Sequence, residues 1–180
     1  MNTEKIKLKY TGEGGVRELL IIALPMILST SCDAIMVFTT RFFLSGLGPE
    51  YMNAAVAGGV MNLVLMFFFT GLIGYSTAIA AQYYGSGRKD LSAVTAFQAI
   101  IISLAAYPVI VGLIPAAENF FYLVGTPCNQ IGHQIEYFEI ICYGAFPSMI
   151  RHAMGCYFTG IGRTRIVMTA TFAALTINIS

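Results

Sequence analysis

The chain has 180 residues, of which 57% are hydrophobic and only 11% are charged, and its formal net charge is +1. Soluble domains carry about twice this density of charge, so the composition excludes an ordinary soluble domain and predicts a membrane protein. The mean hydropathy of +0.73 agrees with this interpretation. The chain has no basic tail of the kind that binds nucleic acid, and no nucleic-acid partner is expected.

The first eighteen residues, MNTEKIKLKYTGEGGVRE, are polar and precede an apolar run that is much longer than the core of a signal peptide. We therefore expect the first apolar run to be a retained helix and not a removed leader. The predicted organisation is a cytoplasmic N-terminal segment, residues 1–18, followed by one helical bundle, residues 19–180, which is incomplete.

Five apolar runs are candidates for membrane-spanning helices, because roughly 20 residues at about 1.5 Å each cross about 30 Å of hydrocarbon. The runs are 19–47, 54–83, 93–117, 135–158 and 166–180. Between the third and fourth runs we expect a short interfacial helix around residues 119–124. The fifth run extends only roughly 22 Å before the chain stops, so we expect a fragment that ends within its fifth helix.

The basic residues that flank these runs predict the orientation of the chain. They are Lys5, Lys7, Lys9 and Arg17 before the first run, Arg88 and Lys89 after the second, and Arg163 and Arg165 after the fourth. The connections after the first and third runs hold no Lys or Arg. Since cytoplasmic connections are rich in Lys and Arg, this alternation places the N-terminus in the cytoplasm.

Prolines and small residues predict how the helices bend and pack. Pro25, Pro108 and Pro147 lie inside three of the runs, and each should bend its helix because proline cannot donate a backbone hydrogen bond. In the second run, Ala55 with Gly59 and Gly74 with Ala78 are spaced for close contact between helices.

Ionisable residues inside apolar runs are costly and usually face a bundle interior or an aqueous path. Asp33 lies near the middle of the first run, and Thr40, seven residues later, shares its face within about 20°. Arg41 lies near the end of this run, where its side chain can reach the interface. Arg151, in the fourth run, either reaches the interface or pairs with an acid on another helix.

Motifs of soluble enzymes do not occur in the sequence. It has no GxxxxGK[ST], HExxH or GxSxG motif, no CxxC pair, and its two histidines, His133 and His152, are far apart. We expect no enzymatic activity, no catalytic residue, no metal site and no cofactor.

Several stretches in order resemble the N-terminal part of the multidrug and toxic compound extrusion (MATE) family of prokaryotic efflux transporters. They are GGVRELLIIALPMILS, FLSGLGPEYMNAAVAGG, AAQYYGSGRKD, EYFEI and FTGIGRTRIVM, with NIS at the end. The match covers nearly the whole chain beyond about residue 13.

The resemblance implies an all-α membrane protein with twelve helices in two six-helix bundles, of which this chain supplies five and is truncated in helix five. It implies a secondary active antiporter that exports organic, often cationic, compounds in exchange for Na⁺ or H⁺. The implied partners are small organic substrates, the coupling cation, membrane lipid and the missing C-terminal half. The implied location is the plasma (inner) membrane of a prokaryote, as a multi-pass protein.

The resemblance also suggests a cation- or substrate-binding site. Members of the family usually carry an acidic residue eight positions before the second glycine of the GLG turn, and here that position is Thr40. The asparagine of helix five is matched by Asn178. Our hypothesis is that Asp33 supplies the charge, with Thr40 and Asn178 as neutral oxygen ligands. The alternative is that Asp33 pairs with a basic residue such as Arg151 and only fixes helix packing.

Two other functions stay open at this point. The first is a lipid-linked oligosaccharide flippase of the same superfamily, which Arg41 and Arg151 would favour through a more cationic cavity. The second is a truncated membrane remnant that does not transport.

Overall fold

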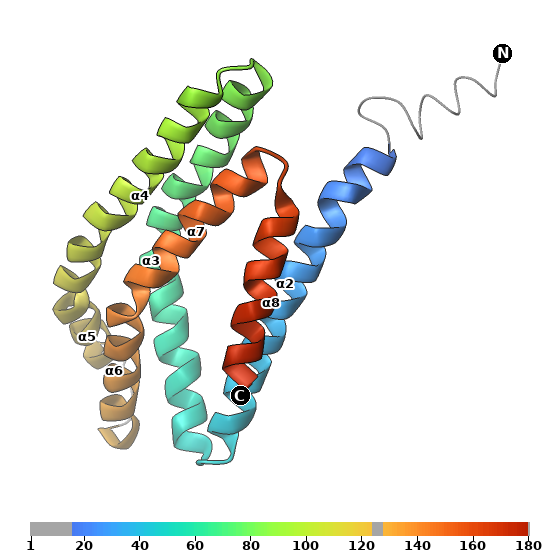
Figure 1. The fold of residues 1–180 in the computed structure, drawn as a ribbon. Coiled ribbons are helices and arrows are strands. Elements are labelled where there is room, and N and C mark those ends of the chain that lie inside the picture. The colour runs from blue at the N-terminus through green and yellow to red at the C-terminus, as the bar shows by residue number, and fades with distance from the viewer. Residues whose placement is uncertain (1–15, 124–127, 180) are drawn as a thin grey trace. The chain divides into compact units, whose positions relative to one another are not determined.

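The computed structural model describes residues 16–123 and 128–179, and almost all of these residues are helical. The described helices, in chain order, are α2 (Val16–Ser45), α3 (Pro49–Gly85), α4 (Lys89–Gly112), α5 (Ile114–Leu123), α6 (Cys128–Tyr143), α7 (Ala145–Gly160) and α8 (Thr164–Ile179) (Figure 1). The described part of the chain contains no strand. The predicted all-α class is therefore confirmed.

Three helices are long and apolar enough to cross a membrane: Leu19–Ser45 within α2, Pro49–Gly85 and Lys89–Gly112. They contain most of the first three predicted runs. The fourth run is divided between α6 and α7, and the fifth falls on α8; each of these helices has 16 residues. The count of five spans, and the twelve-helix whole, stay predictions.

Prolines explain two of the helix breaks. Pro147 has no N–H to donate to the carbonyl of Tyr143, and the chain breaks at Gly144 between α6 and α7. Pro115 stands in the first turn of α5, where a missing donor is tolerated, directly after the break that follows α4. The interfacial helix predicted around residues 119–124 falls on α5, which starts five residues earlier, while residue 124 lies outside the described residues.

The chain divides into two compact units, and the first comprises residues 1–39 and 162–180. Its described helices are the larger part of α2 and all of α8, which run side by side in the same direction (Figure 1). The buried hydroxyls of Ser29 and Thr171 join them at 2.9 Å. Because the Thr171 hydroxyl already donates to the carbonyl of Val167, Ser29 is the donor in this interhelical bond.

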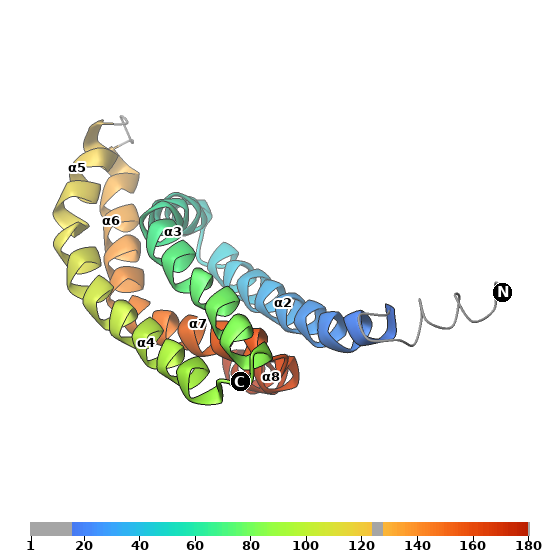
Figure 2. The same cartoon turned by 90° about the horizontal axis from the view of Figure 1, so that it is seen from above.

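The second unit, residues 40–161, is organised around α3. This helix packs against α4, α6 and α7, and α4 also packs against α7. Seen from above, α5 continues the line of α4 after a bend and lies beside α6 (Figure 2). The apolar core of this unit includes Ile73 of α3, Ile110 of α4 and Phe138 of α6, each fully buried.

The buried face of α4 consists mainly of small and hydroxyl-bearing residues. It comprises Ser92, Thr95, Ala99, Ser103, Ala106 and Ile110, at the three- and four-residue spacing of one helix face. Ser92 Oγ donates to the carbonyl of Ala80 on α3 at 3.1 Å. Small residues let backbones approach closely, and a serine can then bond across the interface.

Two glycines mark the closest approaches to α3. A Cβ on Gly160 of α7 would lie 2.6 Å from the carbonyl oxygen of Thr77, and one on Gly58 would lie 3.0 Å from the ring of Tyr137. The prediction for Ala55 holds, since it is buried. A Cβ on Gly59 or on Gly74 would meet nothing within 4 Å, so the described residues show no close contact at either of these predicted glycines.

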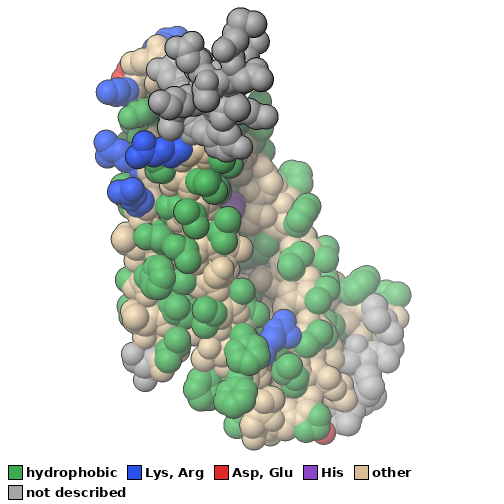
Figure 3. Space-filling view, turned by 90° about the vertical axis from the view of Figure 1, so that its right-hand side faces the viewer, with side chains coloured by type: hydrophobic (Ala, Val, Ile, Leu, Met, Phe, Trp, Pro, Cys, Tyr) green, Lys and Arg blue, Asp and Glu red, His purple; other side chains and the backbone are tan. Residues whose placement is uncertain are grey.

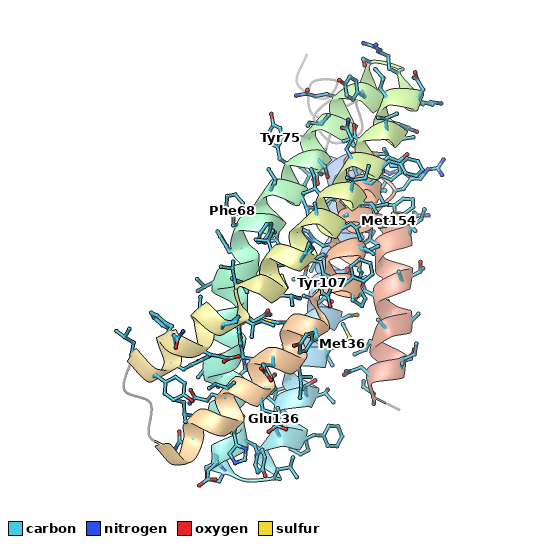
Figure 4. The ribbon with its side chains drawn as sticks, turned by 90° about the vertical axis from the view of Figure 1, so that its left-hand side faces the viewer. Met36, Phe68, Tyr75, Tyr107, Glu136 and Met154 are labelled. Atoms are coloured by element: carbon cyan, nitrogen blue, oxygen red, sulfur yellow. The ribbon has the colours of Figure 1, made fainter. Side chains whose placement is uncertain are left out.

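The outward surface of α3 is rich in large apolar side chains. Phe68 and Tyr75 project away from the helix pair formed by α3 and α4 (Figure 4) and are 71% and 67% exposed. Hydrophobic side chains also cover much of the face shown in the space-filling view (Figure 3). Surfaces of this kind are stable in lipid and not in water, as the composition predicted.

Candidate functional site

A cavity of about 380 Å³ lies within the second unit, between the middle of α3 and the region where α6 gives way to α7. Its lining consists of Gly59, Asn62, Leu63, Met66 and Thr70 from α3, and Ile141, Gly144, Ala145, Ser148, Met149, Arg151 and His152 from the facing segment. The α3 residues recur at three- and four-residue spacing, so they share one face. Cavities of roughly 300–1,000 Å³ with mostly apolar walls are typical of small-molecule sites.

The break at Gly144 shapes this cavity. Gly144 and the following helix N-terminus lie in its wall, where the missing donor of Pro147 interrupts the regular backbone ladder. Irregular backbone at membrane depth is tolerated where it lines a cavity or is buried in protein. The break between α6 and α7 therefore forms part of the cavity wall.

Few polar side chains enter the lining, and their known contacts link helices that are distant in sequence. The Cys142 thiol donates to Asn62 Oδ1 at a sulfur–oxygen distance of 3.9 Å. The Nε2 atom of His152 lies 3.3 Å from the carbonyl oxygen of Thr70. The Thr70 hydroxyl itself is occupied within α3, where it donates to the carbonyl of Met66 at 3.0 Å.

The charge of the lining is positive or neutral. Arg151 is its permanently charged residue, and the lining contains no aspartate or glutamate. His152, which follows Arg151 on α7, is half-buried and also contacts the Cys156 sulfur, at 3.7 Å from Nε2. The cavity thus combines a fixed cation with one group that can gain a proton near neutral pH.

The predicted site residues lie on the helices where the sequence placed them. Asp33 is half-buried on α2 in the first unit, and Asn178 is exposed on α8 in the same unit. Thr40, also on α2, is exposed and is the first residue assigned to the second unit. Their joint action as a cation site stays a prediction.

Within the first unit, Asp33 and Asn178 lie on neighbouring helices. Each follows, in its own helix, one of the two residues of the Ser29–Thr171 contact. Asp33 is one turn past Ser29, and Asn178 is two turns past Thr171, the two residues whose hydroxyls meet. At about 1.5 Å per residue, parallel helices would place the two positions roughly 5 Å apart in height. The predicted pair is therefore compatible with the helix arrangement of this unit.

Sequence reasoning pointed to Arg151 but missed the cavity that this residue lines. His152 was considered only as a possible metal ligand, although an ionisable residue in an apolar run is by itself a signal of function. Asn62 and Thr70 carry no comparable signal. The described residues bring together no group of three His, Cys, Asp or Glu side chains that could hold a metal ion.

A second electrostatic feature involves Glu118 of α5, just beyond the third predicted run, which meets Glu139 of α6. Removal from water raises the pKa of Glu118, and the hydrogen bond to Glu139 and the repulsion between the two charges raise it further. The two carboxyl groups can hold one proton between them, and they then titrate as a pair.

Comparison with known proteins gives a consistent family. The family model MatE matches residues 25–180. The multidrug resistance protein PmpM of Pseudomonas aeruginosa is 25% identical over 165 residues, which are 91% of this chain and 35% of that protein. The probable multidrug resistance protein NorM of Neisseria meningitidis serogroup A is 26% identical, over 91% of this chain and 36% of that protein.

A solved structure has the same fold. It is a MOP superfamily transporter from Pyrococcus furiosus, described as having a binding pocket of reverse polarity that suggests a different function. The TM-score is 0.80 at 23% identity, over 99% of this chain and 39% of that one. The chain spans just over a third of the length of the curated relatives that it matches. The family model covers most of the sequence, and the chain belongs to the MatE family.

Proposed function

We propose that the protein carrying this chain is a secondary active antiporter that exports small organic compounds, often cationic, in exchange for Na⁺ or H⁺. The observation that carries the proposal is the cavity between α3, α6 and α7, which has apolar walls and a few convergent polar groups. The names of the curated relatives, which are multidrug resistance proteins, support the same function.

Transport by the purified protein in liposomes tests this function directly. Ethidium serves as the cationic probe, and a Na⁺ gradient or a pH gradient is imposed in separate experiments. We expect ethidium movement that requires one of the gradients and stops when an ionophore collapses it. Gradient-independent leakage equal to that of empty liposomes would contradict the proposal.

A lipid-linked oligosaccharide flippase is the second candidate, and the charge of the cavity favours it. Arg151 and His152 line the cavity, and no carboxylate does, so an anionic pyrophosphate group would be attracted there. A fluorescent polyprenyl pyrophosphate sugar in the same liposomes separates the two functions. Flipping of this probe without ethidium transport would favour the flippase.

A third possibility is a membrane remnant without transport activity. The mass of the natural gene product in isolated membranes decides whether the 180 residues act alone, and an antibody to residues 1–15 can detect it. A species of about 19.5 kDa would favour a remnant. A species more than twice that mass would favour a complete transporter.

We also propose that the protein is a multi-pass protein of the plasma (inner) membrane of a prokaryote, with its N-terminus in the cytoplasm. The clusters of basic residues, including Arg88 and Lys89 after α3, support this orientation. In a background without the native cysteines, Leu47→Cys and Ser86→Cys place one thiol at each end of α3. An impermeant maleimide added to intact cells should label Cys at 47 and leave Cys at 86 unlabelled.

A further inference from the structure

The position of His152 gives the cavity a possible proton site. Its side chain is half-buried and lies in the cavity wall. The Nε2 atom is 3.3 Å from the Thr70 carbonyl oxygen of α3 and 3.7 Å from the sulfur of Cys156. The ring is therefore held between two helices and is not free to turn into lipid.

The neighbours of the ring identify the nitrogen that titrates. A carbonyl oxygen can only accept a hydrogen bond, so the bond to Thr70 requires a proton on Nε2. The thiol sulfur of Cys156 is a weak acceptor on the same side. With Nε2 donating to Thr70, Nδ1 is the atom that gains or loses a proton.

Among the residues that line the cavity, His152 is the one whose charge can change with pH. On α3 the polar lining residues, Asn62 and Thr70, are neutral, and on α6 the lining residue is Ile141. On α7 the ionisable neighbours are Arg151 and Cys156. Arg151 keeps its charge at every physiological pH.

Ionisable residues farther along the packed helices do not line the cavity. They include Glu50 of α3, Lys89 and Asp90 of α4, and Glu136, Glu139 and Cys142 of α6. Between about pH 5 and 8, an unperturbed histidine changes its charge while Arg, Lys, Asp and Glu do not. Protonation of His152 would therefore add one positive charge to the cavity across this range.

We propose that His152 binds the coupling proton of this protein. This inference rests on the proposed antiport function and deepens it, because it selects H⁺ over Na⁺. Within the cavity the lining favours a proton over a sodium ion, because it offers few side-chain oxygens and, unlike the predicted site at Asp33, Thr40 and Asn178, no carboxylate.

The first test measures protonation without transport. The protein carrying this chain is labelled with ¹⁵N-histidine, and its ring nitrogens are followed by NMR between about pH 5 and 8. His152→Gln assigns the resonance, because glutamine can keep a donor near Thr70 but cannot titrate. We expect a histidine in which Nε2 stays protonated and Nδ1 titrates. A His152 ring that does not change charge in this range would overturn the proposal.

The second test measures coupling in the liposome assay with ethidium. We expect His152→Gln to lower exchange driven by a pH gradient about tenfold, the scale of a typical coupling energy. His133→Gln is the matched control: its ring lies tilted against Tyr51 at a centroid distance of 5.0 Å and does not line the cavity. It should exchange like the parent.

The two proposals fail differently. If the parent protein shows no ethidium exchange under either gradient, the antiport function fails, whatever the NMR titration shows. If the parent exchanges ethidium for protons and His152→Gln does so at an unchanged rate, only the role of His152 is overturned. Exchange driven by a Na⁺ gradient alone would also overturn it.

Discussion

The two ends of the α3–α7 pairing differ, although the same two helices form both. Near the C-terminal end of α3, Gly160 lies so close to Thr77 and Ala80 that an added Cβ would overlap the backbone. Near the middle of α3, Asn62 and Thr70 face a cavity of about 380 Å³. Small residues thus close one end of the interface, while polar residues and the Gly144 break keep the other end open.

This difference has a physical reason in lipid. Without water to drive apolar surfaces together, helices associate where backbones can touch and gain dispersion contacts. The glycine contact supplies that stabilisation at one end. The open part then keeps polar groups of the protein accessible without separating the helices.

The largest expected effect comes from adding one methyl group to the closed end. Gly160→Ala places a Cβ 2.6 Å from the Thr77 carbonyl oxygen, and we expect a loss of about 2–3 kcal/mol in unfolding free energy because the helices must separate. Unfolding of the purified protein by SDS, followed by circular dichroism, measures it. Gly74→Ala is the matched control on α3, where the added methyl meets nothing within 4 Å and should be neutral or stabilising. Equal losses in both variants would contradict the contact.

Filling the cavity with a larger side chain should weaken ethidium binding more than it lowers the stability of the fold. A Cβ on Gly59, which lines the cavity, meets nothing within 4 Å, so Gly59→Leu can project into the hollow. We expect about tenfold weaker ethidium binding by fluorescence titration, since the leucine occupies the space for the ligand. Gly71→Leu makes the same change at an exposed position on α3 outside the lining. If the two variants lost the same affinity, the cavity would not be the binding site.

A smaller effect is expected at the α3–α4 interface. Ser92→Ala removes the buried hydrogen bond to the Ala80 carbonyl and should lower the unfolding free energy by about 0.6–1 kcal/mol. Ser86→Ala is the control, because its hydroxyl makes an exposed bond to Tyr83 within the end of α3. The same SDS unfolding experiment applies. A loss as large for Ser86→Ala as for Ser92→Ala would show that burial of this bond does not matter.

The smallest effect concerns the pH dependence of stability that arises at Glu118. The raised pKa of Glu118 means that the folded state holds this proton more tightly than the unfolded state. Its contribution to stability is therefore full below the ordinary pKa of 4.5 and is lost as pH rises through the raised value. Glu118→Gln should remove this loss, which thermal unfolding at a series of pH values can measure. An unchanged pH slope in the variant would contradict the pairing with Glu139.

The positions of the helices could be predicted because the signal is local. Hydrophobic runs bounded by turn residues gave α2, α3 and α4 to within a few residues. The sequence also marked Pro147 as a point of bending, and the helix does break there. The proposed site residues Asp33, Thr40 and Asn178 could be placed on their helices, but which groups they meet depends on packing.

Composition and periodicity are properties of neighbouring residues, so they were enough to predict the membrane class and the approximate helices, and ordered stretches of sequence carried the resemblance to the family. The cavity depends on tertiary packing. Its contacts join residues 80 and 82 positions apart, Asn62 with Cys142 and Thr70 with His152. Such pairs form because particular faces of α3, α6 and α7 meet, and close approach at Gly58 and Gly160 helps to decide which faces meet.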